Sequence, residues 1–302
     1  MGSQKIKESL VYKKDLVLKS ARDQELEEHE YLFSRTIYNE DGKVTSEKQY
    51  DSQGGLVQDY LYTYNDRGYL IEEKLQESDG FVAIHKSYEF DDNGKLIKEF
   101  RHYMDESFDT VLFHYDENGK LIKKETFDPD NDLESTEEFS YDGDHISRHV
   151  VTDADGDILS EKKIAYDEDG NTIETEEFDG SVGESVKTVN EYYASGNKKE
   201  VLTYNSSGQL VEKVILKEDA QGRIAQVVEE STTKKNTINF TYDASGNVIY
   251  QDEFDRNGEM IGKVSRTYDD NNKLISSDVF IHGGGRGLSR NYTLRQEYVY
   301  YG

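Results

Sequence analysis

Carboxylates at alternate positions in two short segments are the residues with the clearest potential for metal chemistry. They are Asp128, Asp130, Asp132 and Glu134 in DPDNDLE, and Asp153, Asp155 and Asp157 in DADGD. Oxygen ligands at alternate positions are typical of calcium-binding loops. Neither segment completes an EF-hand loop, and tight turns require the same residue types. We therefore predict ordinary turns, with calcium binding as the open alternative and no other metal or cofactor.

The residue patterns of common enzyme sites are missing. The chain has no Cys, which excludes thiolate metal sites and a cysteine nucleophile. His282 precedes three glycines, as in the oxyanion loop of esterases, but the sequence has no G-x-S-x-G motif to supply a nucleophile. His145 and His149 would lie about 13 Å apart along a strand. We therefore predict no catalytic residues and a protein that is not an enzyme.

The charge of the chain restricts its partners. The formal net charge is -27 over 302 residues, with 34% hydrophobic and 33% charged residues. An acidic surface repels nucleic acid phosphates and anionic membranes. No segment approaches the roughly 18 consecutive apolar residues of a membrane-spanning helix. We expect no nucleic acid partner and no membrane insertion, whereas a protein or glycan partner stays open and a basic protein is favoured by charge.

The segment YDENGKLIKKETF, from Tyr115 to Phe127, is one copy of a repeated structural unit. This unit must position the acidic turn residues and any binding residues. In an aromatic-Asp-x-x-Gly sequence, Asp caps the first corner of a turn and Gly adopts the left-handed φ that closes a bulged hairpin. This register predicts that Tyr115 lies across from Leu121 and His114 across from Ile122.

Versions of this unit recur about every 26 residues along the chain. The aromatic residue is found at Tyr12, Tyr38, Tyr64, Phe90, Tyr115, Tyr141, Tyr166, Tyr193, Tyr242 and Tyr268, with a degenerate step near Lys217. A second, looser copy lies between most of these, so each unit contains two strands and two turns. Apolar residues alternate with period two, which indicates strands. We predict an all-β antiparallel meander of about 20 strands, forming an elongated twisted sheet or a partly curled shell.

The same register predicts that the two faces of the sheet differ. The pairs Tyr64 with Leu70, Tyr204 with Leu210, and Phe254 with Met260 would all lie on one aromatic face. Thr63 with Ile71 and Thr267 with Ile275 would lie on a second face of mixed character. The chain is too polar for a thick globular core.

The domain organisation is simple. Residues 1–11 are predicted to be a lead-in that begins with a cloning remnant, Met1 to Ser3, and we expect that a native export signal has been removed. Residues 12–280 form the continuous repeat array, which begins with a long-turn hairpin around residues 20–33. Residues 281–302 supply a glycine-rich loop, Gly283 to Gly287, and a terminal strand.

The recurring motif resembles the YD repeats of the Rhs family and of related bacterial surface proteins. The closest copies are YDENGKL at 115–121, FDDNGKL at 90–96, YDASGNV at 242–248 and YDEDGNT at 166–172. The resemblance extends from about Tyr12 to Leu274 and implies a long sheet that can wind into a shell around a toxin. A looser resemblance, through residues 192–210, is to the MORN-like repeats of bacterial antitoxins.

Two classes of function follow. The first, which we favour, is a non-enzymatic bacterial scaffold that presents an extended acidic sheet for adhesion or for protein or ligand binding, outside the cell or at the cell envelope. The second is a cytoplasmic antitoxin or immunity-type protein that neutralises a basic partner, whose approach the negative charge would accelerate. A shell fragment of an Rhs-like toxin is a further alternative. The sequence identifies no specific binding residues.

Overall fold

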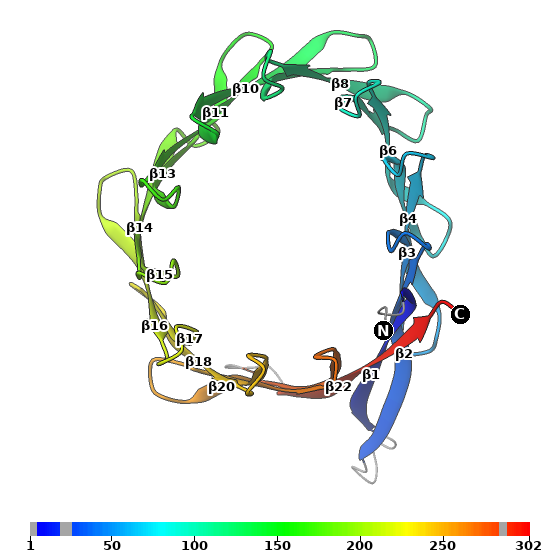
Figure 1. The fold of residues 1–302 in the computed structure, drawn as a ribbon, viewed down its shortest axis with the longest axis vertical. Helices are drawn as coiled ribbons and strands as arrows, with labels where there is room; N and C mark the ends of the chain where they lie inside the picture. The colour runs from blue at the N-terminus through cyan, green and yellow to red at the C-terminus, as the bar shows by residue number, and fades with distance from the viewer. Residues whose placement is uncertain (1–4, 19–25, 284–288) are drawn as a thin grey trace. The chain divides into compact units, whose positions relative to one another are not determined.

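The computed structural model describes residues 5–18, 26–283 and 289–302, and all its regular elements are strands (Figure 1). The strands are β1 (Ile6–Leu18), β2 (Leu26–Tyr38), β3 (Val44–Tyr50), β4 (Leu56–Tyr64), β5 (Leu70–Glu77), β6 (Val82–Phe90), β7 (Leu96–His102), β8 (Phe108–Tyr115), β9 (Leu121–Phe127), β10 (Leu133–Asp142), β11 (His145–Asp153), β12 (Ile158–Tyr166), β13 (Thr172–Asp179), β14 (Glu184–Tyr192), β15 (Lys198–Tyr204), β16 (Leu210–Glu218), β17 (Ile224–Ser231), β18 (Lys235–Tyr242), β19 (Val248–Phe254), β20 (Met260–Tyr268), β21 (Leu274–Ile281) and β22 (Arg290–Tyr300). The predicted all-β meander is confirmed, with 22 described strands. The described part of the chain contains no helix suited to crossing a membrane.

The chain divides into two compact units. Unit 1 comprises residues 1–86 and 238–302, and unit 2 comprises residues 87–237. In unit 2, consecutive strands from β7 to β17 pair antiparallel. In unit 1, β2 to β5 pair in order, as do β19 to β22. The chain passes between the units within β6 and β18.

The first and last strands of the chain pair with each other in unit 1. β1 pairs with β2 along one edge and with β22 along the other, where the register runs from Ile6 opposite Tyr300 to Asp15 opposite Tyr292. The prediction of an open, elongated sheet is therefore wrong, because such a sheet would leave β1 and β22 as free edges. Pairing the two strands satisfies backbone groups that an open meander would expose.

The turns have the predicted chemistry. In a typical one, Asp116 Oδ1 accepts hydrogen bonds from the backbone N–H groups of Asn118 and Lys120, at 2.9 and 2.8 Å. Gly119 then adopts a φ of 83°. Asn39, Asn65 and Asn205 cap their turns in the same way. Asp and Asn are interchangeable at this position because the carbonyl-type oxygen is the atom that accepts.

A bulge beside most turns, though not between β7 and β8 or between β13 and β14, changes the predicted register, which did not count the extra residue. Tyr115 lies opposite Leu121, as predicted, but His114 lies opposite Lys123 and leaves Ile122 without a direct partner. The predictions for Thr63 and Thr267 are wrong for the same reason, because these residues lie opposite Glu72 and Ser276. The extra residue twists the start of each returning strand and displaces its partners by one position.

The bulges also distribute the aromatic residues over both faces. The pairs Tyr64 with Leu70, Tyr204 with Leu210, and Phe254 with Met260 are confirmed. However, Glu47 lies opposite Tyr60 on the face that carries Tyr64, so Tyr50 of the same strand β3 lies on the other face. The prediction of a single aromatic face is wrong, because it assumed strands without bulges.

Neighbouring hairpins separate at one end, and a tyrosine hydroxyl bridges the gap. The ladder between β9 and β10 ends at Lys123 opposite Glu138, yet Tyr141 of β10 donates a 2.7 Å hydrogen bond to the backbone carbonyl of Leu121. The same bond joins each of these tyrosines to a carbonyl near the start of the preceding strand: Tyr64 to Val44, Tyr115 to Leu96, Tyr166 to Ile146, Tyr192 to Thr172 and Tyr268 to Val248. We call the turns that follow these tyrosines the tyrosine row, and the turns at the other strand ends the opposite row.

Lysines after the turn glycines strengthen these bridges. Lys120 Nζ lies 5.1 Å from the centre of the Tyr141 ring and donates to the carbonyl of Gly143 in the next turn. Lys43 makes the same two contacts with Tyr64 and Gly68. Cation–π contacts of this kind contribute about 0.5–1 kcal/mol at exposed sites. The tyrosine row therefore links each hairpin to the next through side chains as well as backbone.

Little of the sheet is buried. Among the described residues, the buried hydrophobic side chains are Val111 and Val150, and the other buried residues are polar. This confirms the prediction that no thick core forms. Stability must therefore come from many similar contacts between neighbouring hairpins, as in other repeat proteins.

Several predicted features fall differently along the chain. Tyr12 lies in the middle of β1, and Tyr192 rather than Tyr193 ends its strand. β1 begins at Ile6, within the predicted lead-in, and pairs with β2 as the expected first hairpin. Met1 to Ser3 and most of the glycine-rich loop, residues 284–288, lie outside the described residues.

Replacing Tyr141 by Phe tests the hydroxyl bridge. The ring and its contact with Lys120 remain, so the change removes one hydrogen bond and leaves the Leu121 carbonyl without its side-chain donor. We expect a loss of about 1 kcal/mol in the free energy of unfolding, measured with urea. Tyr204→Phe is the matched control, since no hydroxyl bridge is described there, and equal losses for both variants would contradict this role of the hydroxyl.

Replacing Glu106 by Gly tests the turn geometry. Glu106 adopts a φ of 69° at the position that glycine usually fills. We expect Glu106→Gly to stabilise the protein by about 1 kcal/mol, because it removes left-handed strain. Gly156→Ala should destabilise the protein by a similar amount, because the φ of Gly156 is 89°. A Cβ there would contact nothing within 4 Å, so the backbone strain alone accounts for the effect. Melting temperatures of the two variants measure these effects. A shift in the same direction for both variants would contradict the assignment of left-handed φ to these turn positions.

Candidate binding surfaces

Four neighbouring turns of the opposite row in unit 2 carry exposed carboxylates. They join β7 to β8, β9 to β10, β11 to β12 and β13 to β14, and these strands pair in sequence. We define the acidic rim as residues 103–108, 128–134, 153–159 and 179–186. Its exposed carboxylates belong to Asp105, Glu106, Asp130, Asp132, Glu134, Asp155, Asp157, Asp179 and Glu184. These four segments contain no Lys or Arg.

Apolar side chains are exposed between these carboxylates. Met104 is 76% exposed and Val182 is 67% exposed, although both are large enough to pack in a core. The other exposed hydrophobic residues of the rim are Tyr103, Phe108, Ile158, Leu159 and Val186. A cluster of exposed apolar residues among charged ones is typical of a protein-binding surface.

Local contacts hold the ends of the rim in place. Phe108 packs edge-on against Phe100, with ring centres 5.4 Å apart. The Tyr103 hydroxyl donates to the buried carboxylate of Asp109, and this hydrogen bond raises the pKa of Tyr103 to about 12. The hydroxyl of Ser181 donates to Asp179 and lowers the pKa of that carboxyl, so it stays charged in mildly acidic solution. These contacts hold Tyr103, Phe108 and Asp179 in defined positions.

The predicted calcium residues all lie in the rim, where two of them cap turns. Asp128 Oδ1 accepts the N–H of Asp132 at 2.8 Å, and Asp153 Oδ1 accepts the N–H groups of Asp155 and Asp157 at 3.0 and 2.9 Å. Asp130 and Glu134 are exposed. Among the described residues, no three His, Asp or Glu side chains converge in a way that could hold a metal ion.

A groove of about 460 Å³ lies at one end of the rim. The side chains of Tyr204 and Val189 form its apolar part, and Glu176, Ser185 and Lys187 form its polar part. Lys187 is paired with Glu174 at 2.8 Å, so its charge is already compensated. The groove therefore extends the rim with a mainly uncharged recess.

The histidines that the sequence analysis considered have structural contacts. His149 stacks on Phe139 at 4.6 Å, and its Nε2 lies 3.0 Å from Glu137 Oε2. His145 packs on Tyr166, with ring centres 4.7 Å apart.

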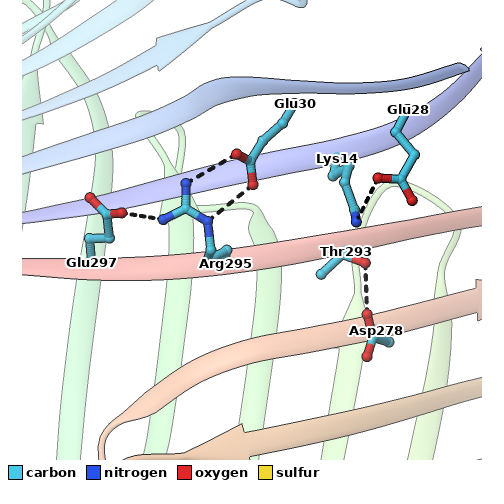
Figure 2. A network of polar contacts seen from close by, with 7 residues as sticks. All are labelled: Lys14, Glu28, Glu30, Asp278, Thr293, Arg295 and Glu297. Carbon is cyan, nitrogen blue, oxygen red and sulfur yellow. Dashed lines mark hydrogen bonds and ion pairs between the residues drawn. The ribbon is translucent and has the colours of Figure 1, made fainter.

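In unit 1, a network of charges ties the first strands to the last (Figure 2). Arg295 of β22 lies over the Tyr12 ring of β1, at 4.3 Å, and reaches across it to Glu30 of β2. Its Nε and Nη2 groups donate to the two Glu30 carboxylate oxygens at 3.0 and 3.2 Å, and Nη1 donates to Glu297. Lys14 pairs with Glu28 beside this contact, at 3.1 Å. One guanidinium thus joins three strands.

In the comparison with known protein families, the match covers a small part of the chain. Residues 109–129, which form β8, its turn and β9, match a family described as a MORN repeat variant. The looser, MORN-like resemblance is thus supported in this segment rather than at 192–210. No curated protein matches the sequence.

The solved structures that match this chain share little sequence with it and have low TM-scores. A porin-like protein from Bacteroides uniformis has 9% identity and a TM-score of 0.37, covering 97% of this chain and 98% of that one. A porin-like protein from Bacteroides vulgatus has 14% identity and a TM-score of 0.29, covering 63% of this chain and 94% of that one. In a TcdB2-TccC3-Cdc42 structure the match has 12% identity and a TM-score of 0.28, and covers 88% of this chain but 19% of that chain.

The seven exposed apolar residues of the rim were not predicted. Met104 was detectable in principle, because a large apolar residue is unusual in a turn sequence such as YMDES. Val182, in the turn sequence DGSVGE, gave the same signal, whereas Leu159 gave none, because alternating strands contain the same residues on their packed faces.

The charge network predicts a pH-dependent contact between β2 and β22. The Arg295 guanidinium hydrogen-bonds the Glu30 carboxylate and lowers its pKa below the ordinary value of 4.5. A lowered carboxyl pKa stabilises the folded state above the ordinary value, and this contribution disappears as the pH falls through the folded-state pKa. We therefore expect Arg295→Gln to lower the melting temperature at pH 7, and we expect this deficit to shrink as the pH falls below the ordinary Glu30 value of 4.5.

Arg290→Gln is the control, because Arg290 is exposed on the same strand. Melting temperatures of the three proteins across this pH range measure the effect. An Arg295→Gln deficit that persists undiminished at pH 3 would show that packing on Tyr12, rather than the ion pair, provides the stabilisation.

Proposed function

We propose that this protein is a non-enzymatic β-repeat scaffold that binds a basic protein segment along the acidic rim. The observation that carries the proposal is the composition of the rim: nine exposed carboxylates and seven exposed apolar side chains on four adjacent turns, without a single Lys or Arg. Carboxylates steer a basic partner toward the rim, and apolar contacts then supply affinity that salt does not screen.

The chemistry of the other row of turns supports the choice of this surface. In the tyrosine row, lysines such as Lys120 lie on tyrosine rings and bond to neighbouring turns. Those side chains are engaged within the fold. On the rim, by contrast, Met104 and Val182 extend from turns that are already capped, so they are available to a partner.

The location of the binding event decides its biological meaning. In an envelope or extracellular setting, which we favour, the rim would serve adhesion or the assembly of surface proteins. In a cytoplasmic setting, the same rim would neutralise a basic toxin. Both settings use the same contacts, so one binding experiment tests the shared claim.

Neutralising four exposed rim carboxylates tests the proposal. The variant Asp130→Asn, Asp132→Asn, Asp155→Asn and Asp157→Asn keeps the turn caps Asp128 and Asp153. A fluorescent peptide rich in Lys and Leu serves as the probe, in fluorescence anisotropy titrations at several salt concentrations. We expect about a tenfold loss of affinity and a weaker salt dependence, since exposed charge pairs contribute a few tenths of a kcal/mol each.

The matched control removes four exposed charges from other parts of unit 2, as Glu117→Gln, Glu138→Gln, Glu168→Gln and Asp169→Asn. Its net charge equals that of the rim variant. If both variants lose the same affinity, the probe responds to overall charge and the rim is not a binding surface.

A further inference from the structure

The turns of the rim determine which kind of partner segment fits it. Extended peptides gain affinity by adding a strand to an open sheet edge, through backbone hydrogen bonds. The rim runs across the ends of the strands, and its backbone groups are used within the turns. For example, Asp128 N–H donates to the Asp132 carbonyl and Asn131 N–H donates to the Asp128 carbonyl, both at 3.0 Å. The rim therefore offers side chains, but no strand edge.

An α-helix satisfies its own backbone hydrogen bonds and needs only side-chain contacts from its partner. Successive rim turns are separated by two strands, or about 10 Å at the usual strand spacing. Seven residues of an α-helix rise about 10.5 Å. Basic residues at heptad spacing on one helix would therefore meet successive acidic turns, and the four turns would span a helix of about 20 residues.

The apolar residues of the rim match the second requirement of such a partner. Exposed hydrophobic side chains occur at three of the four turns, with Met104 at the first, Ile158 at the third and Val182 at the fourth. Pro129 is exposed at the second. An amphipathic helix presents basic and apolar residues in neighbouring stripes, so a single helix can contact both sets.

We infer that the partner segment is a basic amphipathic α-helix of about 20 residues that lies across the four rim turns, with Lys or Arg repeating at heptad spacing. This inference rests on the proposed function and specifies the partner of the same surface. A second copy of this chain is a poor occupant, because the protein carries a net charge of -27 and described helices are absent from it.

Three synthetic 21-residue peptides with the same Lys and Leu content test the inference on the full chain. The first is a Lys/Leu/Ala peptide with Lys and Leu in heptad stripes. The second has the same residues in an order without heptads, and the third is the heptad peptide with one central Ala replaced by Pro. We expect the heptad peptide to bind at least fivefold more tightly than the other two.

Circular dichroism provides the second measurement. Since the described protein consists of strands and turns, a helical signal that appears on mixing comes from the peptide. We expect this signal with the heptad peptide, and we expect it to be lost with the Asp130, Asp132, Asp155 and Asp157 to Asn variant. Equal affinities for all three peptides, or binding without added helix, would overturn the helical partner while leaving the rim as a binding surface. Binding that the rim variant does not weaken would instead contradict the proposed function.

Discussion

Tyrosine hydroxyls that bridge neighbouring hairpins are the contacts on which the rest of this structure depends. A bulge after each tyrosine-row turn shifts the strands, so that the ladder between one hairpin and the next ends early, as it does at Lys123. The Tyr141 hydroxyl then reaches the Leu121 carbonyl that lies beyond the ladder. Without this bond, each repeat would place a poorly satisfied carbonyl next to its neighbour, and an array with so few buried side chains has little else to offset that cost.

This arrangement gives the two rows of turns different tasks. The tyrosine row uses its long cationic side chains internally, since Lys43 and Lys120 contact the ring and the turn of the next hairpin. The opposite row closes with the same Asp caps but has no equivalent bridging tyrosine in unit 2. Its side chains are therefore free to vary in character, and between β7 and β14 they are acidic and apolar. The tyrosine row, at one end of the strands, thus stabilises the fold, and the opposite row, at the other end, carries the proposed binding surface.

The sequence predicted the repeat and failed where a single residue changes the register. Tyr115 with Leu121 was predictable because an Asp-x-x-Gly turn sets the first pair of a hairpin. The partner of His114 was predicted wrongly, because the register was counted without the extra residue that the bulge of this turn adds. Pairing of β1 with β22 was also beyond local rules, since it joins segments at the two ends of the chain through contacts such as Arg295 with Tyr12. For the rim, the Asp residues were identified by spacing, but Leu159 became apparent only with its exposure, because a strand sequence does not distinguish it from a packed residue.

Native-state hydrogen exchange of the turn amides most directly tests whether the tyrosine row, and not the opposite row, links neighbouring hairpins. In most turns of both rows the fourth residue donates the same backbone bond: Gly119 to Asp116 at 3.0 Å in the tyrosine row, and Gly156 to Asp153 at 3.2 Å on the rim. Exchange should therefore differ between the rows only through contacts with neighbouring hairpins. The account predicts slower exchange for Gly119 and its equivalents in the tyrosine row than for Gly156 and the other rim turns. Equal protection in the two rows, or slower exchange on the rim, would contradict it.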